Sequence, residues 1–261
     1  MYSMSGVLTL APATRFADMV RPLTAEQLAR PVPTMPGWTV RDTVVHVANG
    51  PGLYLEGLAG ERRFADGPQD LVGMNEGIRQ DTVDRTVTEA LAAYLRDVHT
   101  LAERLDAMDP DSAVAFHGRS NVLPPAIAGI ALGEVLIHGA DIAATVGARW
   151  TIPSDEAVMV WQGAMGLIGA WLDPATTSDH HATYEVRFRH GPRTRLTIDH
   201  GTLIVDSKER PDCTMSGDPA TLLRLMYGRT STWRAAATGR VVAWGRRPWL
   251  AFSFVNRFQP I

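Results

Sequence analysis

The sequence is poor in cysteine and in net charge, and each shortage narrows the possible classes of protein. Cys213 is the only cysteine among 261 residues, so an internal disulfide is excluded and a cytoplasmic location is expected. The formal net charge of −3 argues against a general nucleic-acid-binding protein. No apolar run is expected to reach the length of a membrane span, and residues 1–16 lack the pattern of a signal peptide. The sequence therefore predicts no nucleic-acid partner and no membrane association.

Lysine is almost absent. Lys208 is the single lysine among 25 basic residues, and all the others are arginine. A genome rich in G and C favours arginine codons, so this skew points to a host such as an actinobacterium and says nothing direct about chemistry.

The first half of the chain has the periodicity of helices. Apolar residues follow helical spacing over 10–23, 71–108 and 125–146. A further helix is expected to start at Thr39, because Thr39 and Asp42 form a variant of the capping box, and Pro51 should bend or interrupt it. We expect a single long helix over 71–108. Four long helices joined by loops predict a helical bundle over residues 1–150.

The pattern changes after residue 150. One more helix is expected at about 154–172, followed by a hairpin formed by 183–190 and 193–201, where polar and apolar residues alternate. Residues 202–217 and 239–247 predict further strands, and 218–229 an amphipathic helix with Asp218 as its cap. Trp233, Trp244 and Trp249 could line a pocket in the second domain, but such residues are more often part of the core. Residues 151–261 therefore predict a small α+β domain.

The stretch GEVLIHGADIA, residues 133–143, places Glu134, His138 and Asp141 in an otherwise apolar helix. Spacings of four and three put these side chains on one helical face. Zinc sites commonly use histidine nitrogen and carboxylate oxygen, and a pair at i and i+4 fixes part of that geometry. His46 lies within another predicted helix and is the candidate third ligand.

Two aspartates have the spacing to orient these histidines. Asp42 precedes His46 by four residues and Asp141 follows His138 by three, so each could accept the second ring N–H of its histidine. The residues alone leave simpler interpretations open. A Glu/His pair at i and i+4 is often only solvated, and Asp42 already has a place in the capping box. The apolar surroundings favour a metal, because buried ionisable groups are costly unless paired or ligating.

Two segments together resemble a known family. The segment PVPTMPGWTVRDTVVHVANG, with Pro36-Gly37-Trp38 and Asp42/His46, precedes Glu134/His138/Asp141 by about ninety residues. Their order and spacing resemble the mycothiol-dependent maleylpyruvate isomerase family, within the DinB-like four-helix metalloproteins. The tail, notably SGDPATLLRLMYGR, resembles the sterol-carrier-protein-like domain of this family. The resemblance implies a mixed fold: a DinB-like four-helix bundle over 1–150, then a small α+β domain over 151–261.

The resemblance also implies a chemistry. It implies that His46, Glu134 and His138 bind a divalent metal, with zinc the expected ion, and that Asp42 and Asp141 support these ligands. The implied cofactor is a low-molecular-weight thiol, mycothiol, and the partners are this thiol and a small electrophilic substrate. A thiol is mostly protonated at neutral pH, and coordination to zinc deprotonates it. The expected reactions are thiol transfer or isomerisation.

Residues that contact the substrate are harder to assign. The family uses an arginine on the helix after the first metal ligand, so Arg79 is the catalytic candidate and Asn75, one turn earlier, a substrate-binding candidate. Arg85 competes with Arg79, and Arg119 precedes the metal-binding helix. Two other functions stay open: a non-catalytic protein that binds a small ligand, and a thiol-independent metallohydrolase. The sequence does not identify the electrophile and leaves open whether the protein is a homodimer.

Overall fold

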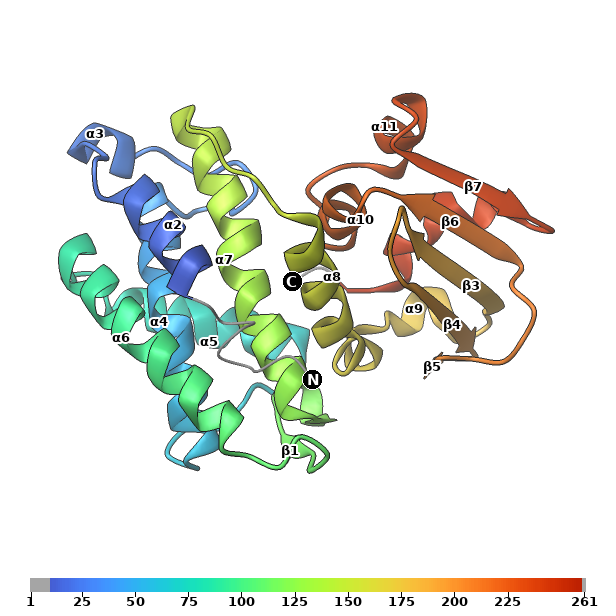
Figure 1. The fold of residues 1–261 in the computed structure, drawn as a ribbon, viewed down its shortest axis with the longest axis horizontal. Coiled ribbons are helices and arrows are strands. Elements are labelled where there is room, and N and C mark those ends of the chain that lie inside the picture. The colour runs from blue at the N-terminus through green and yellow to red at the C-terminus, as the bar shows by residue number, and fades with distance from the viewer. Residues whose placement is uncertain (1–9, 260–261) are drawn as a thin grey trace. The chain divides into compact units, whose positions relative to one another are not determined.

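The computed structural model describes residues 10–259, and these divide between Ile152 and Pro153 into two compact units (Figure 1). The first unit is helical and the second contains a mixed sheet. This confirms the predicted class, a helical domain followed by an α+β domain.

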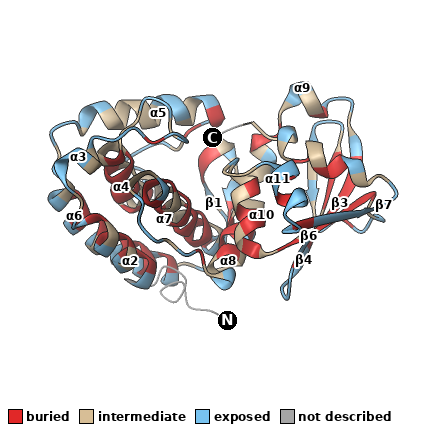
Figure 2. Cartoon of the chain, turned by 90° about the horizontal axis from the view of Figure 1, so that it is seen from above, coloured by how far each residue is buried: buried red, intermediate tan, exposed pale blue. Residues whose placement is uncertain are grey.

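The first unit is a four-helix bundle with additional short elements. Helices α2 (Leu10–Val20), α4 (Val40–Leu58), α6 (Val87–Asp106) and α7 (Pro124–Val146) pack against one another, and α5 (Pro68–Asp81) packs against α4. The short helix α3 (Ala25–Leu28) precedes α4, and strands β1 (Val114–Ala115) and β2 (Asn121–Val122) flank a turn of 3-10 helix, His117–Arg119. Figure 2 shows the buried residues of this unit concentrated on α4 and α7.

Helix α4 begins where the sequence predicts. The Thr39 side chain accepts a hydrogen bond from the Asp42 N–H, and the Asp42 carboxylate accepts one from the Thr39 N–H, which completes a capping box. Pro51 lies inside the helix and is buried, yet the helix continues to Leu58. The expected interruption is absent because packing against α6 and α7 holds the helix on both sides of the missing N–H.

The prediction of one helix over 71–108 was wrong. The chain forms α5 and α6, separated by residues 82–86. Thr86 has an extended backbone and forms a second capping box with Glu89, so a new helix starts there. The Arg41 guanidinium donates hydrogen bonds to the carbonyl oxygens of Thr82, Val83 and Arg85, at 2.6–2.7 Å. These bonds tie the connection to the first turn of α4.

Helix α7 is the central apolar element of the first unit. By length and composition alone it could cross a membrane, contrary to the expectation that no segment reaches such a length. However, 72% of its most apolar stretch is buried inside the structure, as in the core helix of a bundle. The ionisable side chains on this helix therefore lie in largely apolar surroundings.

The second unit is built on a five-stranded sheet with the order β5-β4-β3-β6-β7, in which only the β3–β6 pair is parallel. The strands are β3 (His181–Phe188), β4 (Arg193–Asp199), β5 (Thr202–Val205), β6 (Cys213–Gly217) and β7 (Val241–Gly245). The helices are α8 (Ser154–Met165), α9 (Pro174–Thr177), α10 (Pro219–Met226) and α11 (Thr232–Ala237). The predicted hairpin and the cap at Asp218 are confirmed.

The three C-terminal tryptophans are not core residues. Trp233, Trp244 and Trp249 are exposed, with relative accessibilities of 69%, 43% and 60%, so the expectation of burial was wrong. The core is instead formed by residues such as Tyr184, Leu196 and Ile198. Trp233 stacks on Phe252 with ring centroids 3.9 Å apart, and Arg187 lies over Trp244. Local contacts with a ring or a guanidinium therefore replace burial for Trp233 and Trp244.

We expect Thr86→Ala to lower the free energy of unfolding by about 1 kcal/mol, because it removes the cap that starts α6. Thr88→Ala is the matched control, since Thr88 is exposed within the same helix. Chemical denaturation of both variants measures the difference. Equal stabilities would show that the break at 82–86 does not depend on this cap.

Candidate functional site

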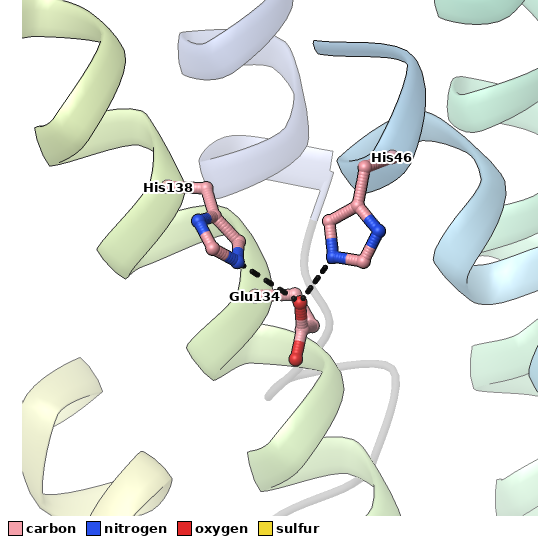
Figure 3. Close-up of side chains that lie close together, drawn as sticks. All are labelled: His46, Glu134 and His138. Atoms are coloured by element: carbon pink, nitrogen blue, oxygen red, sulfur yellow. Dashed lines mark hydrogen bonds and ion pairs between the residues drawn. The ribbon is translucent and has the colours of Figure 1, made fainter. Parts of the chain in front are cut away.

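Three ionisable side chains converge between two helices of the bundle. His46 projects from α4, and Glu134 and His138 project from successive turns of α7 (Figure 3). One oxygen of Glu134, Oε2, lies 3.3 Å from His46 Nε2 and 3.5 Å from His138 Nε2. Each residue offers a ligand atom, and these atoms lie within 4.8 Å of one another. The three predicted ligands therefore form one cluster, although His46 and Glu134 are 88 residues apart in the sequence.

The cluster is half-buried and remains accessible to a small molecule. The exposed fractions of the side chains are 15% for His46, 29% for Glu134 and 12% for His138. The two imidazole planes are nearly perpendicular, at 84°, with ring centroids 5.2 Å apart. Trp38, at the start of α4, contacts His46 edge-on at 5.2 Å. Packing thus fixes the orientation of the His46 ring.

Asp141 orients His138 as predicted. Its Oδ2 lies 3.3 Å from His138 Nδ1, and its side chain is only 3% exposed. Burial disfavours the charged form of His138, but the Asp141 and Glu134 carboxylates outweigh this effect and raise its pKa to about 9. Burial likewise disfavours ionised Glu134, and the hydrogen bonds from the two histidines reverse this and hold its pKa well below the usual range. Glu134 and His138 therefore favour each other's charged form.

Asp42 does not support His46 in the way its spacing predicted. Its carboxylate accepts hydrogen bonds from the Thr39 N–H and hydroxyl, at 3.0 and 2.8 Å, and from Arg41, at 3.2 Å. None of its described hydrogen bonds reaches His46. The capping box uses this carboxylate, so the simpler interpretation of Asp42 is the one that the structure shows.

A polar recess adjoins the cluster on the His46 side. This hollow has a volume of about 200 Å³. One side of it is formed by α4 and the residues just before it: Trp38, Arg41, Asp42, Val45, His46 and Asn49. The other side is formed by Asn75, Ile78 and Arg79 of α5 and by Thr82, which follows α5. Asn75 and Arg79, the predicted substrate-binding and catalytic residues, therefore share one recess with His46. Arg79 pairs with Glu76 at 2.6 Å. Because the helix breaks at residues 82–86, α5 is a separate helix from α6. It can therefore pack against α4 and place Arg79 in the recess.

The other two arginine candidates are placed differently. Arg85 donates a hydrogen bond to Asn49 Oδ1, so it supports a residue that lines the polar recess. Arg119 pairs with Asp66 at 2.8 Å, and its side chain is 78% exposed. The structure gives Arg119 no described contact with the cluster.

Sequence reasoning missed two contributors. Arg41 was not singled out because its partners are backbone carbonyls more than forty residues away, which leave no local signal. Buried His117 was also missed, since a single histidine in a loop has no informative spacing. Its Nδ1 accepts a hydrogen bond from the Ala65 N–H at 3.0 Å. It thereby anchors the segment that leads into α5.

A second cluster of possible metal ligands lies in the other unit. His181, Asp199 and His200 are all exposed and meet at the end of the β3–β4 hairpin. Both histidines lie within hydrogen-bond distance of Asp199 Oδ1, at 3.0 and 2.7 Å. These contacts give both histidines a hydrogen-bond partner without an ion. The cluster is therefore a suitable control in metal-binding experiments.

Family models match both parts of the chain. The model of the mycothiol maleylpyruvate isomerase N-terminal domain matches residues 10–143, and the model of the SCP-2 sterol transfer family matches residues 171–245. By its N-terminal half the chain belongs to the mycothiol maleylpyruvate isomerase family, which confirms the resemblance read from the sequence.

Solved structures agree at the level of the fold. A crystal structure of the mycothiol-dependent maleylpyruvate isomerase is 16% identical, with a TM-score of 0.54, over 88% of this chain and 90% of that one. A histidine-to-alanine mutant of that enzyme is 15% identical, with a TM-score of 0.54, over 92% of each chain. At these identities the likeness shows the shared fold alone. No curated protein matches the sequence.

The stability of the protein should depend on the protonation of His117. Burial lowers the pKa of His117 to about 4, against the opposing effect of the Glu134 and Asp70 carboxylates. The ordinary value of about 6.5 applies to the unfolded chain, which therefore binds a proton between pH 6.5 and 4 that the folded protein does not bind. The free energy of unfolding should fall as the pH drops through this window, by ~3 kcal/mol for this group.

Denaturation curves of the wild type and His117→Asn from pH 7 to pH 4 measure this contribution. The variant should lose less stability on acidification, although it is less stable at pH 7. Burial also lowers the pKa of His180 to about 4, so only the difference between variant and wild type reports on His117. His99→Asn, at an exposed position of α6, is the control. Parallel pH profiles of wild type and His117→Asn would contradict this assignment.

Proposed function

We propose that the protein is a metal-dependent enzyme that uses a low-molecular-weight thiol, mycothiol, to act on a small electrophile. The reaction is thiol S-transfer or an isomerisation of the maleylpyruvate type. The observation that supports this most directly is the convergence of His46, Glu134 and His138 from two helices. Family membership supports the thiol, since the matching domain is that of mycothiol maleylpyruvate isomerase.

The donor set fits a divalent metal. Two imidazole nitrogens and one carboxylate oxygen are a common set for catalytic zinc, which leaves a fourth position for an exogenous ligand. The partial exposure of Glu134 is consistent with such an open position. Zinc also accounts for the ionisable groups on α7, because a buried ion pair alone is a weak source of stability. When bound, the metal lowers the pKa of a coordinated thiol and so supplies a thiolate at neutral pH.

The chain's own residues have separable tasks in this proposal. His46, Glu134 and His138 hold the metal, and Asp141 keeps the His138 ring oriented so that Nε2 faces the centre. Arg79 and Asn75 line the polar recess beside His46, where they can hydrogen-bond to the polar part of a reactant. Trp38 covers one edge of the His46 ring and limits the access of water from that side.

The same ligand set would also support a metallohydrolase, in which a metal-bound water attacks the substrate. A non-catalytic protein that binds a small ligand is the other alternative. The three functions differ in their requirements: the first needs both metal and thiol, the second only metal, and the third neither.

We expect the protein to bind one zinc ion at the His46–Glu134–His138 cluster and to bind mycothiol through it. His46→Ala or His138→Ala should weaken zinc binding on the order of 100-fold or more, because each removes one of three protein ligands. Calorimetry on protein freed of metal by a chelator measures the affinity. In the cobalt-substituted protein, mycothiol should add an absorption band of sulfur-to-cobalt charge transfer.

Two matched variants serve as controls for that experiment. His99→Ala removes an exposed histidine from α6, and His181→Ala disrupts the exposed cluster of the second unit. Both should keep the high-affinity zinc site. Loss of zinc binding in His181→Ala but not in His46→Ala would refute the proposed centre. Turnover with zinc and no thiol would favour the metallohydrolase.

Arg79→Ala should lower kcat/KM roughly ten- to hundred-fold in the thiol-dependent reaction, because it removes one charged hydrogen-bond donor from the polar recess. The affinity for zinc should stay the same, since Arg79 is not a ligand of the cluster. Arg104→Ala, at an exposed position of α6, is the control. Unchanged kinetics in Arg79→Ala would remove Arg79 from the reaction.

A further inference from the structure

A second hollow adjoins the cluster on the Glu134 side. The empty space in it, open solvent included, is about 390 Å³. All four long helices of the bundle contribute to its lining, for example Ala13, Val47, Tyr54, Val98 and Leu132, and Glu134 completes it. We call it the apolar hollow.

The two hollows lie on different faces of α4. Val45, His46 and Asn49 line the polar recess, whereas Val47, Gly50 and Tyr54 line the apolar hollow. Spacings of three and four residues keep each set on its own side of the helix. The two spaces meet at the cluster, because His46 lines one, Glu134 lines the other, and their side chains lie 3.3 Å apart.

The two hollows differ in the charges that they offer. Arg41 and Arg79 line the polar recess, whereas no arginine, lysine or histidine is among the described residues, 10–259, that line the apolar hollow. Its ionisable groups are the Glu134 carboxylate and the hydroxyls of Tyr54 and Tyr94. Burial, together with the Glu134 charge, raises the pKa of Tyr94, so this hydroxyl stays neutral. Among the described residues that line this hollow, an anionic ligand would meet a carboxylate and no cationic side chain, which is unfavourable in a partly buried site.

We infer that the apolar hollow binds the electrophile and that this electrophile is an uncharged, mainly apolar molecule rather than a dicarboxylate. The inference rests on the proposed function and adds the class of substrate to it. The polar recess then receives the polar body of the thiol, and the two reactants meet at the cluster between them.

An uncharged α,β-unsaturated ketone illustrates the reaction that this arrangement allows. The thiolate sulfur forms a bond to the β-carbon, and the π electrons of the C=C bond move onto the carbonyl. The proton released by the thiol then ends on the α-carbon. The step is redox-neutral and needs no further reactant.

Two unreactive ligands test the charge preference without any turnover. 4-Phenylbutan-2-one is a saturated, uncharged ketone, and its 4-carboxyphenyl analogue differs only by one carboxylate. We expect the zinc-loaded protein to bind the uncharged ketone at least about 100-fold more tightly, because no described residue that lines the hollow offers a cationic side chain to the carboxylate. Calorimetry gives the affinities, and NMR shift changes should centre on residues 47–54 and 94–98. Equal binding, tighter binding of the carboxylate, or shifts confined to residues 75–82 would overturn the inference.

Gly50 allows the hollow to be filled with little disturbance of the fold. A Cβ placed on Gly50 meets no atom within 4 Å, and Gly73 of α5, which lines neither hollow, is equally open. Gly50→Leu should weaken binding of the uncharged ketone about tenfold or more, while Gly73→Leu should leave it unchanged. Both variants should keep wild-type affinities for zinc and mycothiol. Equal ketone binding in Gly50→Leu and the wild type would overturn the location.

These experiments test the proposed function and the inferred class of substrate separately. Failure of zinc or mycothiol to bind would refute the proposed function, whatever the ketones do. Normal binding of zinc and mycothiol with no preference for the uncharged ketone would refute only the inferred class of substrate.

Discussion

The contact between the carboxylate of Glu134 and the imidazoles of His46 and His138 is the interaction on which the candidate site depends. It joins α4 to α7, the two helices that carry most of the buried residues of the bundle. A carboxylate in such surroundings is unfavourable unless it is paired, and the two histidines pair it. Replacing such a group of ionisable residues by apolar ones is often neutral or stabilising. Its presence in the middle of an apolar helix is therefore better explained by chemistry than by stability.

The cluster also divides the space around it. The polar recess depends on α5, a helix separate from α6 because of the break at residues 82–86, which packs against α4. The apolar hollow depends on the packing of all four long helices. One reactant can therefore be recognised by hydrogen bonds and the other by shape and the absence of charge. The separation follows from the two faces of α4, because neighbouring residues such as His46 and Val47 point into different surroundings.

Those parts of the fold that local sequence determines were predictable. The capping box at Thr39 fixed the start of α4, and the spacing of Glu134, His138 and Asp141 placed three side chains on one face of α7. Interactions between distant residues were not predictable. The apolar periodicity runs on through Val83 and Val87, and it concealed the second capping box and the contacts of Arg41 with the 82–86 connection. The partner of Asp42 could not be predicted either. Its spacing allowed a contact with His46 or with Thr39, and the structure shows that the carboxylate bonds to Thr39.

The contacts of Arg41 have a consequence for how this site can diversify. The candidate ligands belong to α4 and α7, whereas Asn75, Ile78 and Arg79 of the polar recess belong to α5, and the Arg41 guanidinium ties the end of α5 to α4. Sequence changes along α5 can alter which polar molecule is accepted and leave the bundle and its cluster intact. The residues that recognise a polar molecule can therefore change at a different rate during divergence from the residues of the reactive centre.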